Sequence, residues 1–402
     1  MAYSISLGPD GSSYIVRYLD DDQRSLIELM KYDSEGDLVW TKKFSVFAFS
    51  APLAAHDGTI RFLTTDSSNR SMAILHSFDA DGNILWECRI DGMENAAFFP
   101  SDRLILSADG TVFFSLNEFS LYDPLPSNYT ICAVDGSGEL KWRDRFNPTF
   151  GNFAAETDGD GKFYVLVDPD KLYCIGPEGD VLWNLTFEYV MDTNGRSIVI
   201  GSNGTVFVSY GRSVIDISDD GGVRWSRITP SRVISGIALG TCDTIYISIE
   251  DDPFEDVKGG ICAFSPDGVM IWREDIGQGH VTPIVDDLGI VICCSQDHIY
   301  GIDLEGQVKW SYDAGGYVGA AKMTEEGILL FLVYDSSSTT VLIASDGVPV
   351  LTMTEWLSRN YAWIILLIVS SAFGAYIAWT LLNGRIKSGS DRYDPIKKWP
   401  KK

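Results

Sequence analysis

Basic side chains are scarce in this sequence. Its 402 residues include 31 Lys and Arg against 56 Asp and Glu, which gives a formal net charge of −25. A protein that binds nucleic acid needs a basic face to neutralise phosphates, so this composition argues against nucleic acid as the main ligand.

Histidine and cysteine are also few, and neither is arranged for chemistry. The four histidines stand alone in the sequence, at His56, His76, His280 and His298. The seven cysteines are odd in number and include no Cys-x-x-Cys pair, so neither a disulfide framework nor a zinc site is indicated. We therefore expect no metal ligands, no cofactor and no catalytic residues.

Long stretches rich in Ala, Leu, Glu and Lys are missing as well, which disfavours a helix bundle. Hydrophobic residues make up 45% of the chain and aromatic residues 12%, and there are 38 glycines. This composition favours a large core built from β-structure.

One segment differs from all the others because it carries no charge over 22 residues, Tyr361–Leu382. At about 1.5 Å per residue a helix of this length reaches roughly 33 Å, enough to cross a membrane. Aromatic side chains near both ends, including Trp363 and Trp379, suit the two membrane interfaces. We expect a transmembrane helix here, although a buried core helix is the alternative, and a basic tail at residues 383–402.

A repeat organises the preceding residues, and its first marker is a glycine four positions before a tryptophan. The copies are Gly36/Trp40, Gly82/Trp86, Gly138/Trp142, Gly179/Trp183, Gly221/Trp225, Gly268/Trp272 and Gly306/Trp310, with Gly347/Leu351 as a variant eighth. The second marker is a turn, such as Asp57-Gly58 or Asn203-Gly204, followed by a run of alternating apolar residues. Turns of this type connect antiparallel strands.

Four strands every 40–50 residues are typical of a propeller blade. Each period predicts strand A, an Asp-Gly turn, strand B, a variable loop, strand C, an acid-Gly turn and strand D with the tryptophan. We expect an all-β, eight-bladed propeller of four-stranded antiparallel blades over residues 1–355. The seven tryptophans are expected to fill the gaps between neighbouring blades.

The repeat resembles a known family. Ala133–Trp142, AVDGSGELKW, and Gly301–Trp310, GIDLEGQVKW, are similar to the repeat of PQQ-like, or quinoprotein alcohol dehydrogenase-like, β-propellers. The non-enzymatic branch includes the propeller lipoprotein of outer-membrane protein assembly. The resemblance implies the fold more strongly than the function, because the motif holds blades together.

One pair of cysteines and two acidic segments raise an enzymatic alternative. The adjacent Cys293 and Cys294 resemble the vicinal disulfide of quinoprotein dehydrogenases, but they also fit a buried apolar strand. Asp158-Gly-Asp160 and the acidic run from Glu250 to Asp256 invite a calcium interpretation. We expect no PQQ binding, and keep a PQQ- or metal-dependent oxidoreductase as the alternative.

Binding is expected on the face that carries the B–C and D–A connections, because these vary in length and contain aromatic residues. Residues 44–49, between the first and second blades, are expected to be one of these variable segments. The candidate residues in these loops are Phe119, Tyr122, Tyr129, Asp251, Asp252 and Phe254. The favoured function is a membrane-anchored, non-catalytic scaffold that binds a protein or another extracellular ligand, and a structural component of the cell envelope is a further alternative.

The basic tail predicts that the C-terminus is cytoplasmic and the propeller extracytoplasmic. Four N-glycosylation sequons, at Asn69, Asn128, Asn184 and Asn203, agree with this orientation. The N-terminal residues do not read as a signal peptide, so a tail-anchored protein with a cytosolic propeller is the alternative. Ser370, Gly374 and Ala378 lie on one face of the expected helix and suggest a homodimer.

Overall fold

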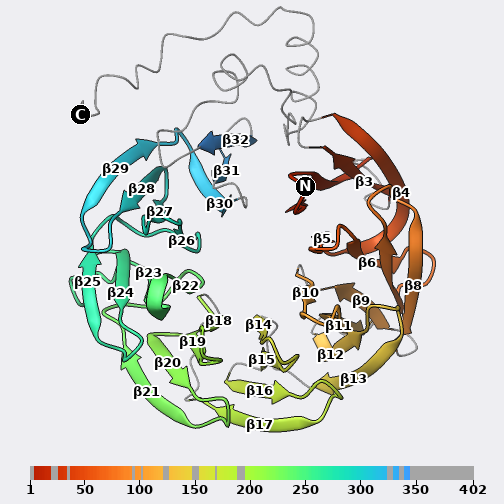
Figure 1. The fold of residues 1–402 in the computed structure, drawn as a ribbon, viewed down its shortest axis with the longest axis horizontal. Coiled ribbons are helices and arrows are strands. Elements are labelled where there is room, and N and C mark those ends of the chain that lie inside the picture. The colour runs from red at the N-terminus through yellow and green to blue at the C-terminus, as the bar shows by residue number, and fades with distance from the viewer. Residues whose placement is uncertain are drawn as a thin grey trace, which may run out of the picture.

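The computed structural model describes residues 4–19, 26–33, 37–92, 96–100, 103–120, 126–146, 154–167, 170–187, 195–323, 329–334 and 339–344. Its sheets are arranged as a ring, as Figure 1 shows, with the first and last blades on either side of the same gap in the ring. Within the described residues, the only helical element is the short 3₁₀ turn η1 (Thr241–Asp243). The described part of the chain is therefore all-β and consists of antiparallel sheets.

The described strands form seven antiparallel sheets, which we divide into blades according to the sequence repeat. The first sheet has eight strands and contains blades one and two, because β4 also pairs with β6. The first four blades contain β1 (Ser4–Leu7), β2 (Ser13–Tyr18), β3 (Leu26–Tyr32) and β4 (Leu38–Phe49); β5 (Leu53–Ala54), β6 (Ile60–Asp66), β7 (Met72–Phe78) and β8 (Ile84–Asp91); β9 (Ala96–Pro100), β10 (Ile105–Leu106), β11 (Val112–Ser120), β12 (Pro126–Val134) and β13 (Leu140–Phe146); and β14 (Ala154–Thr157), β15 (Phe163–Val167), β16 (Lys171–Ile175) and β17 (Val181–Thr186).

The last four contain β18 (Ser197–Ile200), β19 (Val206–Tyr210), β20 (Ser213–Ile217) and β21 (Val223–Ile228); β22 (Ala238–Leu239), β23 (Ile245–Ile249), β24 (Gly260–Phe264) and β25 (Met270–Glu274); β26 (Ile284–Val285), β27 (Val291–Ser295), β28 (His298–Ile302) and β29 (Val308–Asp313); and β30 (Tyr317–Met323), β31 (Leu329–Tyr334) and β32 (Thr339–Ala344). Blade eight has three strands within the described residues, and the position of its variant Gly347/Leu351 marker lies outside them.

The turns between strands A and B form where the sequence places Asp-Gly. In blade two, Asp57 Oδ1 accepts a hydrogen bond from Thr59 N at 2.9 Å, and Gly58 has φ = +77°. A positive φ costs a glycine little because it has no Cβ. The side chain and the glycine together close the turn and align β5 with β6.

Burial differs between the inner and outer strands of a blade. Every residue of β15 is buried, whereas β17 at the rim alternates between half-buried and exposed residues. The inner strands are covered on both faces by neighbouring blades, so they read as continuous apolar runs rather than as alternating ones. The core is accordingly a series of layers between blades.

The connection between blades one and two differs from the predicted loop at residues 44–49. β4 continues as a strand to Phe49, and its end pairs with β6, for example Phe49 with Thr64. Phe44 and Phe49 both pack against Phe62, so apolar contacts hold this segment in the sheet. The prediction of a variable loop there is wrong, because alternation continues through the segment.

The tryptophan of each outer strand reaches the next blade. The indole Nε1 donates a hydrogen bond to a carbonyl oxygen two residues before the next blade's repeat glycine. The pairs are Trp40 to Ala80 (3.0 Å), Trp86 to Gly136 (2.9 Å), Trp142 to Pro177 (3.2 Å), Trp183 to Asp219 (2.8 Å), Trp225 to Pro266 (2.9 Å) and Trp272 to Leu304 (2.8 Å). Trp310 packs over Gly301 of its own blade, and Gly347 lies outside the described residues.

The repeat glycine is required by this contact. Gly179 has φ = +90°, and a Cβ added to it would lie 2.6 Å from the Trp142 ring. A residue with a side chain would be strained there and would also displace the indole. The acid-Gly turn and the tryptophan are thus two halves of one contact between blades.

A β-bulge precedes each of these tryptophans. In β13, Trp142 pairs with Ala133 while Leu140 pairs with Val134, so Lys141 has no partner in the ladder. The same shift occurs at the start of β4, β8, β17, β21, β25 and β29. A bulge bends the strand and increases its twist. It therefore aims the indole at the neighbouring blade.

The C-terminal part of the chain, residues 345–402, lies outside the described residues, and so do the expected transmembrane helix, the basic tail and the helix face of Ser370, Gly374 and Ala378. Among the residues that are described, none forms a helix of sufficient length and apolarity to cross a membrane.

Candidate functional site

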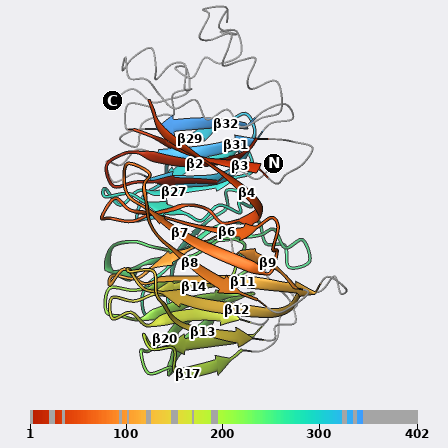
Figure 2. The same cartoon turned by 90° about the vertical axis from the view of Figure 1, so that its right-hand side faces the viewer.

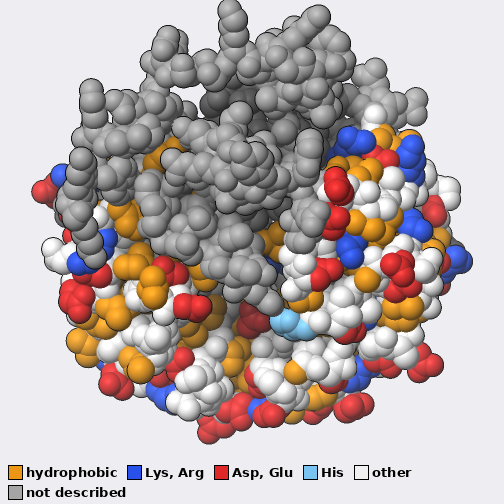
Figure 3. Space-filling model, turned by 45° about the horizontal axis from the view of Figure 1, so that its top comes forward, with side chains coloured by type: hydrophobic (Ala, Val, Ile, Leu, Met, Phe, Trp, Pro, Cys, Tyr) orange, Lys and Arg blue, Asp and Glu red, His pale blue; other side chains and the backbone are white. Residues whose placement is uncertain are grey.

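The strands cross the thickness of the ring, so their connections gather on its two sides, as Figure 2 shows. Because successive strands are antiparallel, the A–B and C–D turns share one side and the B–C and D–A connections share the other. We call the second side the variable face. On the face that Figure 3 shows, acidic side chains are spread among hydrophobic and basic ones.

Acidic residues of the first side are used to close turns. Asp135 Oδ1 accepts hydrogen bonds from Ser137 N and Glu139 N, each at 2.9 Å. The Ser137 hydroxyl and these backbone amides lower the pKa of Asp135. Asp158 of the suspected calcium loop behaves in the same way, because its two oxygens accept from Lys162 N (2.9 Å) and the Tyr164 hydroxyl (3.0 Å). These carboxylates serve the fold.

The variable face carries a structured loop in blade six, residues 250–259, between β23 and β24. Asp252 and Val257 exchange two backbone hydrogen bonds of 2.8 and 2.9 Å across it. Asp252 Oδ1 also accepts from Phe254 N at 3.0 Å, which closes the tip. Asp251 Oδ1 accepts from Gly259 N at 2.6 Å and holds the base. The loop therefore has a defined conformation.

Phe254 stands at the tip of this loop with 98% of its surface exposed. Arg212 from the B–C turn of blade five braces the tip, because its Nη1 and Nη2 each lie 3.2 Å from an oxygen of Glu255. The hydrogen bond to Glu255 raises the pKa of Arg212. Arg232 forms an ion pair with Glu250 at the base. The acidic residues of the loop are thus partly matched by arginines.

A hollow of about 380 Å³ lies on the variable face of blade seven. It is lined by Gln278, His280, Gln296, Asp297, Gly315, Gly316 and Tyr317. Three backbone hydrogen bonds join its rim: Gln296 N to Gln278 O (3.3 Å), Ala314 N to Asp297 O (2.7 Å) and Val318 N to Gln296 O (2.7 Å). These bonds connect the B–C turn with the D–A segments on either side.

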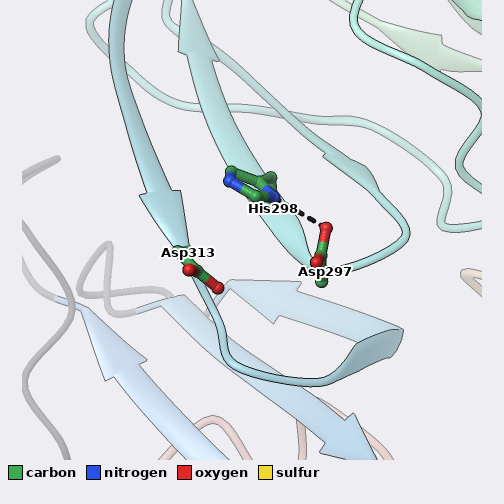
Figure 4. A group of neighbouring side chains, drawn as sticks. All are labelled: Asp297, His298 and Asp313. Carbon is green, nitrogen blue, oxygen red and sulfur yellow. Dashed lines mark hydrogen bonds and ion pairs between the residues drawn. The ribbon is translucent and has the colours of Figure 1, made fainter. Parts of the chain in front are cut away.

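Asp297, His298 and Asp313 lie close to one another, as Figure 4 shows, and Asp297 also lines the hollow. One donor atom of each lies within 4.8 Å of the others, and His298 Nδ1 is 2.7 Å from Asp297 Oδ1. The contact with His298 lowers the pKa of Asp297, so this carboxylate is charged at neutral pH. Such a group could accept a divalent metal ion, or the ammonium or guanidinium group of a partner.

The other predicted binding-face residues lie in different surroundings. Phe119 is a half-buried residue of β11, and Tyr122 lies outside the described residues. The expectation that Tyr129 is exposed in a loop is wrong, because it lies in β12 and is only 4% exposed. β11 and β12 pair as far as Phe119 and Pro126, which extends the hairpin beyond its predicted end.

Among the sequon asparagines, Asn69, Asn184 and Asn203 are exposed. Asn69 lies in the B–C turn of blade two, where its Oδ1 accepts from the Ser71 hydroxyl at 3.0 Å. Asn184 lies in β17 and Asn203 in an A–B turn. Asn128 lies in β12, and its side chain is not among the described ones.

Cys293 and Cys294 are free, buried residues of β27. Cys293 packs in one core cluster with Tyr246 and Ile302, and Cys294 packs in another with Ile299 and Phe331. Adjacent residues of a strand point to opposite faces, and the two thiols therefore lie in different layers. Burial raises the pKa of the Cys294 thiol to about 12.

Sequence reasoning missed a polar group in blade two. Thr64 Oγ1 lies 2.9 Å from His76 Nε2, and His76 Nδ1 lies 2.9 Å from Glu87 Oε1. Thr64 and His76 are buried, and burial lowers the pKa of His76. This order of groups resembles that of a hydrolytic triad, but the hydroxyl is sealed from solvent. The three residues lie on the neighbouring strands β6, β7 and β8. Their proximity can be recognised only once the pairing of these strands is known.

The fold and the blade contacts define a β-propeller whose blades are joined by tryptophan and glycine. Residues 127–248 match the sequence family PQQ_2, described as outer membrane protein assembly factor BamB. The match covers less than half of the chain, and a search of curated protein sequences found no match. Over these residues the chain thus resembles the PQQ-like propellers, of which BamB is one.

Solved structures with the same fold agree. BamB from Moraxella catarrhalis is 12% identical, with a TM-score of 0.55 and coverage of 83% of this chain and 96% of its own. The C-terminal WD40 domain of Sif2 is 13% identical, with a TM-score of 0.58 and coverage of 86% and 95%. The dihydro-heme d1 dehydrogenase NirN in complex with DHE is 14% identical, with a TM-score of 0.55 and coverage of 87% and 73%. At such identities the likeness concerns the fold.

Proposed function

We propose that this protein is a membrane-anchored, non-catalytic, eight-bladed propeller that binds another protein through its variable face. The observation that carries the proposal is Phe254, an almost fully exposed aromatic ring on a loop held by Asp252 and Arg212. An aromatic side chain presented by a rigid support is typical of the residues that dominate protein interfaces. The resemblance to BamB, an assembly factor for outer membrane proteins by its description, supports a scaffold role.

The anchoring part of the proposal rests on the sequence of residues 361–402. An uncharged segment long enough to span a bilayer is followed by seven basic residues, which favours a cytoplasmic tail and an extracytoplasmic propeller. Three exposed sequon asparagines, Asn69, Asn184 and Asn203, are compatible with that side of the membrane.

The non-catalytic part rests on where the reactive side chains lie. The triad-like hydroxyl of Thr64 is buried, and the thiols of Cys293 and Cys294 lie in separate core layers. A nucleophile must reach its substrate, and a vicinal disulfide needs both sulfurs on one side. These residues therefore support packing roles in this chain.

The test is photo-crosslinking of the full chain in its native membrane. A photoreactive phenylalanine analogue is placed at Phe254 or Tyr317 on the variable face, or at Leu288 or Asn203 on the opposite side. We expect a discrete adduct of higher mass from Phe254 and Tyr317 only. Adducts from Leu288 and Asn203 alone, or equal adducts from all four positions, would contradict the proposed face.

A further inference from the structure

We propose that the variable face of blades five to seven docks a basic segment of a partner protein. An apolar residue of that segment would pack on Phe254, and a Lys or Arg would enter the hollow beside Asp297. The inference rests on the proposed function as a protein-binding scaffold and adds the chemistry of the partner.

Phe254 is prepared for such a contact before binding. Three interactions fix its loop: the bridge between Asp252 and Val257, the capping of the tip by Asp252, and the bidentate pair of Arg212 with Glu255. A loop that is ordered in advance loses little conformational entropy when a partner binds. The ring has no packing partner of its own to give up, because 98% of its surface is exposed.

The loop and the hollow belong to one connected strip. Gly259, the last residue of the loop, accepts a hydrogen bond from Gly277 N at 3.0 Å, and a Cβ at Gly259 would lie 2.8 Å from Gln278 N. Gln278 lines the hollow and accepts from Gln296 N. One segment of a partner could therefore contact the two features together.

The charge of the strip selects the partner. Residues 250–256 contain five carboxylates, and Asp297 and Asp313 add two more beside the hollow. Two arginines nearby are already engaged, Arg212 with Glu255 and Arg232 with Glu250. The loop itself carries one exposed cation, Lys258, so carboxylates outnumber the basic groups of the strip. The potential over the strip is consequently negative, and the polar, carboxylate-bearing wall of the hollow suits an ammonium or guanidinium group. Complementary charge would also steer a basic partner toward this side.

The probe is a phage library of random peptides, selected on the purified full chain in detergent and counter-selected on Phe254→Ala. The consensus peptide is then synthesised, and its affinity is measured by calorimetry at two salt concentrations. We expect the consensus to contain Lys or Arg beside an aliphatic or aromatic residue. Phe254→Ala should weaken binding by at least about tenfold, as for a residue that dominates an interface.

Two further variants make the test specific. The double variant Asp297→Asn, Asp313→Asn should weaken binding severalfold and flatten its salt dependence, since charge attraction is screened by salt. Leu288→Ala is the matched control, because Leu288 is 80% exposed in blade seven but lies on the A–B turn of the opposite side. It should leave the affinity unchanged, and unaltered circular dichroism will show that each variant is folded.

The inference is overturned if no peptide is enriched, if the enriched peptides lack basic residues, or if Phe254→Ala and Leu288→Ala bind equally. The outcome is separable from the proposed function. Photo-crosslinks from Phe254 to a partner whose attached peptide carries no Lys or Arg would support the scaffold role and refute the basic segment.

Discussion

Replacing Trp142 by alanine should test the blade contact most directly. The indole is only 9% exposed, and its ring lies 5.8 Å from the ring of Phe113. Its Nε1 donates to Pro177 O of the next blade at 3.2 Å. Removal of a large buried aromatic side chain costs about 3–5 kcal/mol. The lost hydrogen bond lies within that figure and accounts for about 1 kcal/mol of it.

The measurement is urea denaturation of the full chain, followed by far-ultraviolet circular dichroism so that loss of indole fluorescence does not interfere. Trp142→Phe should lose about 1–2 kcal/mol, because the hydrogen bond disappears but most of the packing remains. Gly179→Ala should be destabilising as well, since φ is +90° there and the new Cβ would lie 2.6 Å from the indole. Leu140→Ala, two positions away and partly exposed, is the control.

A loss below about 1 kcal/mol for Trp142→Ala would refute the reasoning, because it would mean that the indole contributes little more than an exposed side chain. A loss for Leu140→Ala equal to that for Trp142→Ala would also refute it. In that case the outer strand as a whole, rather than the contact between blades, would determine the stability.

Three other outcomes are expected. Burial lowers the pKa of His76, so the unfolded chain binds more protons than the folded one, and the free energy of unfolding should fall as the pH drops below about 6.5. His76→Gln should reduce this pH dependence in urea titrations. An unchanged pH dependence would exclude His76 as its source. Cys293 and Cys294 should resist iodoacetamide in the folded protein, because burial raises the pKa of both thiols. Mass spectrometry should find the exposed Cys242 alkylated under the same conditions. Rapid labelling of Cys293 and Cys294 would contradict their burial. Gly374→Ile should abolish self-association of residues 361–382 in a membrane reporter if small residues pair the helices, and a monomeric parent segment would refute the dimer.

Much of the fold could be predicted from the sequence because its contacts repeat. A glycine and a tryptophan, such as Gly82 and Trp86 or Gly138 and Trp142, stand four residues apart in seven of the eight periods. The period reveals which elements must be equivalent. The positive φ at these glycines and the position of each indole over the next glycine explain why the pattern is so regular. Because the same contact between blades recurs in each repeat, the residues that form it recur in the sequence at a regular spacing.

The candidate site was less predictable because it lies where the repeat is interrupted. Tyr129 was expected in a loop because the B–C connection of blade three is longer in the sequence than those of other blades. In the structure Tyr129 pairs with Phe146 on the neighbouring strand and is part of the sheet. His76 and its partners were missed because they are neighbours only across three strands. The group at Asp297 and Asp313 likewise depends on the pairing of β28 with β29, in which His298 lies opposite Asp313.

The division between the two sides of the ring has a physical cause. Acids of the C–D turns, such as Asp79 and Asp303, accept backbone N–H groups that the turn would otherwise leave unsatisfied. Side-chain hydrogen bonds from Asn83 and Lys309, together with these backbone bonds, lower the pKa values of the two carboxyls. Their oxygens are committed to the fold, and a ligand would have to compete with the backbone. The loop of Phe254 satisfies its own backbone groups through Asp251 and Asp252, which leaves an aromatic ring with no structural task. Because this ring stands on an ordered loop beside a polar hollow and supports nothing in the fold, it is the residue to examine first for a partner.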